Sequence, residues 1–143
     1  MPDRLIPSID GKRGGFLLII GIGWLTIGLS YVLGPRTESR QAGFSWLPSW
    51  LDANELGWAW VAAGLTAIIA ALVSKRWKWV ESLAFGSLIA PTALWTAVFA
   101  IAFIVGEHPY GWISAVSYGI FTAVIYHCSS WPNPVRRAEE PSA

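Results

Sequence analysis

Residues 83–105, LAFGSLIAPTALWTAVFAIAFIV, decide the fold class of this chain. The stretch contains no Asp, Glu, Lys or Arg. It is longer than the roughly 20 helical residues that cross the roughly 30 Å hydrocarbon core of a bilayer. Three further charge-free stretches of comparable length lie at 14–33, 56–73 and 110–128. We therefore predict an all-α, polytopic membrane protein, with four transmembrane helices forming a single domain over residues 1–143.

The composition agrees with a chain whose solvent is lipid. The protein is 54% hydrophobic and 13% charged, with a mean hydropathy of +0.47, whereas an ordinary soluble domain carries roughly 25% charged residues. A buried soluble helix bundle is the alternative, and four charge-free stretches in one short chain disfavour it. The first stretch exceeds the roughly 7 to 15 apolar residues of a signal peptide, and no A-x-A-like cleavage site follows it. We interpret it as a retained span.

The basic residues predict the orientation, because cytoplasmic loops collect Lys and Arg. One side of the predicted membrane holds eight of them: Arg4, Lys12, Arg13, Lys75, Arg76, Lys78, Arg136 and Arg137. The opposite loops hold only Arg36 and Arg40. Both termini are therefore predicted to be cytoplasmic, in a multi-pass protein of the cytoplasmic membrane. The ends, 1–13 and 129–143, combine proline with both charge signs and are predicted to be flexible, with their paired basic residues against anionic headgroups.

Tryptophan is concentrated near the predicted membrane surfaces, where an indole buries its rings among acyl chains while its N–H meets headgroups or water. The predicted interface anchors are Trp46, Trp50, Trp58, Trp60, Trp77, Trp79, Trp112 and Trp131. The spacing of Trp46 and Trp50 predicts a short interfacial helix in the first outer loop. Asp52 and Glu55 then resemble a capping box that starts the second span. A ligand site for a lipid-linked or aromatic molecule is the alternative function of this loop.

Small residues in the spans predict helix packing, because they let two backbones approach closely in lipid. The predicted packing residues are Gly21, Gly28, Ala59, Ala63, Ala67, Ala71, Ala115, Gly119 and Ala123. Trp24 and Trp95 fall near the middle of their spans, where they either pack against a neighbouring helix or form a constriction.

Hydroxyl side chains recur along the fourth predicted span. The predicted polar stripe comprises Ser114, Ser117, Tyr118, Thr122 and Tyr126. In hydrocarbon such groups need partners, so the stripe predicts either hydrogen bonds between helices or the lining of a wet path in an oligomer.

The sequence offers little for catalysis or coupled transport. An ion-coupled transporter normally keeps an ionisable group inside the bilayer, whereas none of the four stretches contains a carboxylate, lysine or arginine. His108 and His127 belong to opposite sides of the predicted membrane and cannot share a haem. No nucleophile or second carboxylate stands near Glu107 and His108. We predict no enzyme, no catalytic, cofactor or metal site, and no nucleic-acid partner. The position of the lone Cys128 would suit palmitoylation in a eukaryote, and we interpret it as a reduced cysteine without a role.

The closely spaced spans and the short charged tail RRAEE (136–140) resemble the small multi-span membrane proteins of bacteriophages of high-GC bacteria, among which are the holins. The resemblance covers the layout of the whole chain, and most holins have one to three spans. It implies assembly in the cytoplasmic membrane and the opening of lesions for an endolysin. Two other hypotheses are a structural or regulatory subunit of a larger membrane complex and, less favoured, a small-solute channel or transporter. The expected partners are the lipid bilayer and either further copies of the chain or another membrane protein.

Overall fold

The computed structural model describes residues 11–35, 38–73 and 78–131, and every regular element within them is helical. The elements, in chain order, are α1 (Gly11–Leu33), α2 (Glu38–Gln41), the 3₁₀ helix η1 (Ala42–Phe44), α3 (Ala53–Val73), α4 (Lys78–Ile104) and α5 (Gly111–Ser129). The all-α prediction is confirmed for the described part of the chain.

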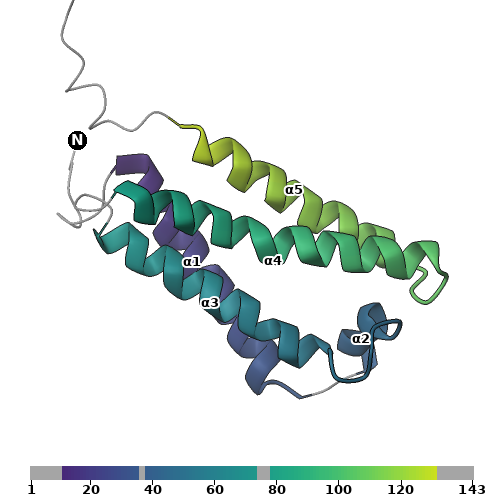
Figure 1. Ribbon diagram of the computed structural model, residues 1–143. Helices are drawn as coiled ribbons and strands as arrows, with labels where there is room; N and C mark the ends of the chain where they lie inside the picture. The colour runs from purple at the N-terminus through teal and green to yellow at the C-terminus, as the bar shows by residue number, and fades with distance from the viewer. Residues whose placement is uncertain (1–10, 36–37, 74–77, 132–143) are drawn as a thin grey trace, which may run out of the picture.

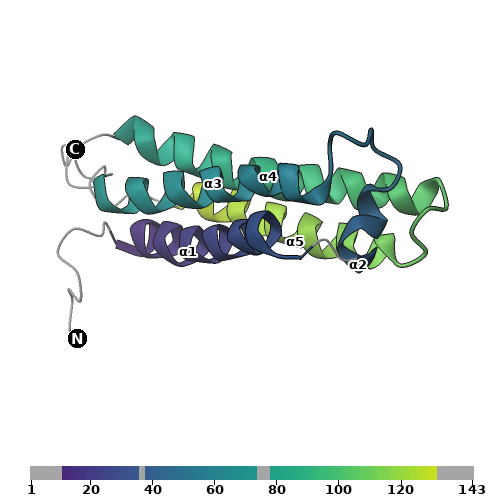
Figure 2. The same ribbon diagram turned by 90° about the horizontal axis from the view of Figure 1, so that it is seen from below.

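The four long helices run alternately up and down (Figure 1; Figure 2). Helix α1 packs against α3, α3 against α4, and α4 against α5. We call the end that holds the starts of α1 and α4 the basic end, and the end that holds residues 38–52 and 105–110 the loop end. The α1–α3 pair and the α4–α5 pair spread apart toward the loop end, where α2 and η1 lie (Figure 1).

Three of the long helices are long and apolar enough to cross a membrane: α1, α3 and residues 79–104 of α4. Helix α5 is not among them. Its 19 residues include serine, threonine, tyrosine and histidine side chains, which lower its apolarity although it carries no formal charge. The absence of charge predicted a fourth span, and the length and hydropathy of α5 do not show one.

The helices begin earlier than the charge-free stretches. Helix α1 starts at Gly11, α3 at Ala53 and α4 at Lys78, against predicted starts at 14, 56 and 83. A helix start tolerates polar residues, because its first amides have no partner within the helix. Residues 11–13 are therefore helical and not part of a flexible end; 1–10 and 132–143 lie outside the described residues.

The first loop differs from the prediction. Its helical turns fall at 38–44, and the segment from Trp46 to Leu51 forms turns, with the Leu51 amide donating to the Pro48 carbonyl at 2.8 Å. Pro48 disfavours the helical conformation at Leu47, the residue before it, and so opposes a helix that contains both Trp46 and Trp50. The Asp52 part of the predicted capping box is present, since the Glu55 amide donates to Asp52 Oδ1 at 2.9 Å.

Glycines bring the α1 and α3 backbones together. A Cβ added to Gly28 would lie 2.5 Å from the Val61 nitrogen, and one added to Gly64 would lie 2.5 Å from the Leu25 nitrogen. Gly21 faces Gly64 in the same way, since a Cβ added to Gly21 would lie 3.0 Å from the Gly64 carbonyl oxygen. The interface thus depends on the absence of side chains at these positions.

Aromatic rings fill the core where the two helix pairs diverge. Trp60 and Trp95 are fully buried, with ring centroids 5.4 Å apart. The Phe44 side chain of η1 packs into this core. Its ring centroid lies 5.3 Å from that of Trp95 and 5.7 Å from that of Phe99. Gly43 sits so close to the Phe99 ring that a Cβ would overlap it. The first loop therefore contributes buried residues, Gly43 and Phe44, to the core.

Candidate functional site

A largely buried ion pair lies at the basic end of the bundle. Arg13 of α1 faces Glu81 in the first turn of α4, and the two side chains are 17% and 8% exposed. Arg13 Nη1 also donates to the carbonyl of Trp131, just beyond α5, at 2.8 Å. Its guanidinium carbon lies 5.1 Å from the centre of the Phe85 ring. One side chain thus connects α1, α4 and the end of α5.

Aromatic rings surround this pair. Phe16 stacks on Phe85 with centroids 6.0 Å apart and meets Trp131 edge-on at 6.2 Å. Exclusion of water strengthens the attraction between charges, because the local dielectric constant falls. An ionisable pair within helices that can cross a membrane is by default a candidate functional site.

The predicted contact of Arg13 with lipid headgroups is wrong in this structure, because the side chain turns inward to Glu81. Its neighbour Lys12 is exposed, and Arg136 and Arg137 lie outside the described residues. Glu81 is the sequence feature that could have predicted this ion pair. It is a single carboxylate at the edge of an apolar stretch, and a carboxylate buried there requires a partner of opposite charge.

The indole N–H groups of the aromatic core differ in their hydrogen bonding. Trp24 Nε1 donates to the Leu88 carbonyl at 3.3 Å. Leu88 lies about one turn before Pro91, next to Ser87, whose carbonyl loses its helical partner because proline has no N–H. The buried Nε1 atoms of Trp60 and Trp95 have no hydrogen-bond partner among the described residues. Trp24 and Trp95 thus both pack inside the bundle.

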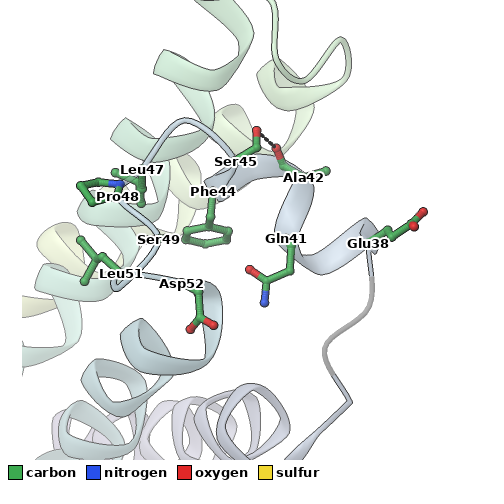
Figure 3. A pocket seen from close by; sticks show the side chains of 10 residues that line it. All are labelled: Glu38, Gln41, Ala42, Phe44, Ser45, Leu47, Pro48, Ser49, Leu51 and Asp52. Atoms are coloured by element: carbon green, nitrogen blue, oxygen red, sulfur yellow. Dashed lines mark hydrogen bonds between the residues drawn. The ribbon is translucent and has the colours of Figure 1, made fainter.

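A recess of about 470 Å³ opens in the first loop (Figure 3). Its lining residues are Glu38, Gln41, Ala42, Phe44, Ser45, Leu47, Pro48, Ser49, Leu51 and Asp52. The Gln41 amide donates to Asn54 Oδ1 at 3.3 Å, and Asp52 caps α3. The Glu38 carboxylate extends away from the centre (Figure 3). The side chains of Gln41 and Asp52 therefore stabilise the loop, and the recess is an open hollow in that loop.

The predicted interface anchors separate into three groups. Trp50, Trp58, Trp79 and Trp112 are exposed. Trp46 and Trp131 are half-buried, and Trp77 lies outside the described residues. Trp60 lies in the core, so its prediction as an anchor is wrong: two residues on a helix differ by about 200° in direction, which places Trp58 and Trp60 on opposite sides of α3.

The predicted polar stripe does not stay on one side of the bundle. Ser114, Tyr118 and Thr122 are half-buried, whereas Ser117 and Tyr126 are exposed. Residues four apart drift about 40° around a helix at each step, which turns the end of the stripe outward.

Two hydroxyls of the stripe bond within their own helix. Ser117 Oγ donates to the Ile113 carbonyl at 2.8 Å, and Thr122 Oγ1 to the Tyr118 carbonyl at 2.9 Å. Such back-bonding satisfies a hydroxyl without a partner from another helix or from water.

The small residues predicted to mediate packing also divide. Ala63, Ala67 and Ala71 are buried in α3, and Ala67 lies beside Gly21 of α1, whereas Ala59 is exposed. In α5, Ala115 and Gly119 are half-buried and Ala123 is exposed. Gly57 and Gly64 also pack closely on α1, and sequence reasoning missed them.

The described residues contain no cluster of three or more His, Cys, Asp or Glu side chains able to hold a metal ion. His108 lies at the loop end, 6.0 Å from the Phe99 ring, and His127 is exposed in the last turn of α5. No family model, curated protein or solved structure matches this chain. Function must therefore be inferred from the ion pair, the core and the surface of α5.

Proposed function

We propose that the chain is a four-span protein of the cytoplasmic membrane that associates with further copies of itself through α5, in a holin-like manner. The supporting observation is a conflict within α5. It is the long helix whose apolarity falls short of the other three, yet its buried residues are only Gly111, Ile125 and Cys128. A helix that exposes so much surface to lipid should be among the most apolar. A protein partner on its outer face resolves the conflict.

The outer face of α5 has the composition of a helix–helix contact. Its exposed residues recur at spacings of three and four, and they include Val116, Ser117, Ile120, Ala123, Val124 and His127. Ser117 and Ala123 are small enough for a close approach of two backbones, and the larger aliphatic side chains pack around them. The same face on a second copy is self-complementary under a two-fold axis.

Helix length and the exposed tryptophans support the proposed position in the membrane. The 19 residues of α5 extend about 28 Å at 1.5 Å per residue, close to the thickness of the hydrocarbon core. Exposed Trp112 and Trp50 lie at the loop end, and exposed Trp79 lies at the basic end. These positions fit two interfacial belts, and the excess of Lys and Arg favours the basic end as cytoplasmic.

The topology is tested with single cysteines in a Cys128→Ser background. We expect Ser49→Cys and Glu107→Cys to react with a membrane-impermeant thiol reagent added to intact cells, because both residues lie in exposed loops at the loop end. Ala143→Cys should react only after the cells are opened. Labelling of Ala143→Cys from outside would contradict four spans with cytoplasmic termini.

Association is tested by disulfide crosslinking in membranes. In the Cys128→Ser background we expect Ile120→Cys and Ala123→Cys to form homodimers in severalfold higher yield than Ile22→Cys. Ile22 is the matched control, since this isoleucine of α1 is exposed to a similar extent, 53% against 59% for Ile120. Equal yields at Ile22 and Ile120 would indicate random collision and refute a contact through α5.

The holin-like role requires a further measurement. Aromatic side chains fill the described core near the loop end, so we expect any conducting path to lie between copies and not along the bundle axis. Expression in bacteria should dissipate the membrane potential, and an α5 face blocked by Ala123→Trp should reduce the leak. Crosslinked homodimers without leakage would instead support a structural subunit.

A further inference from the structure

We propose that Arg13 and Glu81 form a latch that holds the end of α5 against the bundle, and that opening this latch releases α5 for association. The second half of this inference rests on the function proposed above. The first half, a local lock on α5, stands on the contacts at the basic end alone.

Helix α5 packs closely on α4 but only loosely on α1. Its backbone packs along α4, whereas α1 and α5 make little backbone contact. Side chains connect α1 and α5 at three levels within the described residues. Toward the loop end, Tyr118 shares a side-chain hydrogen bond with Tyr31. Near the middle, Trp24 meets Phe121 edge-on at 5.8 Å. At the basic end, Arg13 and Phe16 both contact Trp131, through its carbonyl and its ring respectively. The described attachment of α5 to α1 at this end therefore runs through Trp131.

Glu81 positions Arg13 for this attachment. The carboxylate neutralises a guanidinium that is only 17% exposed and keeps it beside the Trp131 carbonyl. Without Glu81, the guanidinium would be an uncompensated charge among Phe16, Phe85 and Trp131. Leaving one partner of a buried pair alone is far more costly than removing both, so the charge should turn toward solvent and abandon Trp131.

The chain contains its own reporter of this motion. Cys128 is the single cysteine of the sequence, it lies three residues before Trp131, and it is 4% exposed. With the end of α5 in place, a thiol reagent cannot reach its Sγ atom. Separation of this end from α1 and α4 uncovers it.

The test measures the rate at which a membrane-permeant maleimide labels Cys128 in the full-length protein in lipid nanodiscs. We expect Glu81→Gln and Arg13→Gln each to raise the rate about tenfold or more. Lys12→Gln removes the same charge from an exposed neighbouring position and should leave the rate unchanged. The double variant Arg13→Gln, Glu81→Gln should label no faster than either single variant, because both act on one contact. Unchanged labelling in Glu81→Gln, or rates that multiply in the double variant, would overturn the latch.

A second reporter separates local opening from general loosening. Ala53 is fully buried at the opposite, loop end of the bundle. In an Ala53→Cys, Cys128→Ser protein, adding Glu81→Gln should leave the labelling rate unchanged. Equal acceleration at positions 53 and 128 would mean that the substitution destabilises the whole bundle, which also overturns the latch.

Crosslinking of Ile120→Cys in the Cys128→Ser background, with and without Glu81→Gln, tests the link to association. More homodimer in Glu81→Gln supports the release of α5. Faster Cys128 labelling without more homodimer overturns that release and leaves the lock in place. No homodimer in either protein refutes the proposed function, and the Cys128 rates then decide the latch independently.

Discussion

Replacing Gly28 with alanine is expected to separate α1 from α3 and to destabilise the protein by about 3 kcal/mol or more. The new methyl group would lie 2.5 Å from the Val61 nitrogen and 3.0 Å from the Trp60 carbonyl carbon. Both are backbone atoms, so no side-chain rotation relieves the overlap. The two helices must move apart and lose the packing on which association in lipid depends.

Gly23 provides the matched control, five residues earlier in the same helix. A Cβ added there meets no atom within 4 Å. Gly23→Ala should therefore stabilise the protein by up to about 1 kcal/mol, the usual gain when alanine replaces glycine within a helix. Reversible unfolding in mixed micelles, followed by circular dichroism, measures both variants. Equal stabilities would show that α1 and α3 do not make the close contact described above.

The α1–α3 interface shows how much of the helix packing the spacing of small residues can predict. Gly21 and Gly28, seven residues apart in an apolar stretch, were predicted to pack, and they lie against α3. Gly57 and Gly64 carry the same seven-residue spacing and were missed, because the alanines at four-residue intervals dominate that stretch. Spacing identifies a face of a helix, but only the position of the neighbouring helix determines which face is buried. For this reason Ala59 is exposed, although it belongs to the series of alanines four residues apart in α3.

The pairing of Arg13 with Glu81 was not predicted, for a different reason. Both residues lie just outside the charge-free stretches that defined the predicted spans; Arg13 was predicted to contact lipid headgroups, and no role was predicted for Glu81. The helices extend past those stretches and carry the two charges into contact across 68 positions of sequence separation (81 minus 13). Such a pairing depends on how α1 and α4 cross, which hydropathy does not encode.

Helix α5 marks the limit of the charge criterion. A stretch without Asp, Glu, Lys or Arg was sufficient to predict a span, whereas its serine, threonine, tyrosine and histidine residues leave it less apolar than α1, α3 and α4. The hydroxyls of this helix were predicted either to bond between helices or to line a wet path. Tyr118 shares a side-chain hydrogen bond with Tyr31 of α1, whereas Ser117 and Thr122 bond within α5, an option that a helical backbone offers to a hydroxyl.

Replacing Trp60 with alanine is expected to destabilise the protein by about 3 to 5 kcal/mol, the usual loss for a large aromatic side chain in a core. Trp60 is fully buried, and its ring meets Trp24 at 5.0 Å, Trp95 at 5.4 Å and Tyr118 at 5.8 Å. Its removal leaves a cavity that touches α1, α4 and α5 together. The three helices cannot all collapse into that space, because each is held by separate contacts elsewhere.

Trp58 distinguishes the core assignment from an interfacial one. It lies two residues earlier in α3 and is 56% exposed. Trp58→Ala should change the free energy of unfolding by no more than about 0.5 kcal/mol, as is usual for surface positions. Trp60→Phe should lose much less than Trp60→Ala, because it keeps an aromatic ring in the cluster and removes an indole N–H that has no partner among the described residues. If Trp58→Ala and Trp60→Ala were equally mild in the same micelle unfolding experiment, both indoles would face the membrane surface. The aromatic core would then not hold α1, α3, α4 and α5 together.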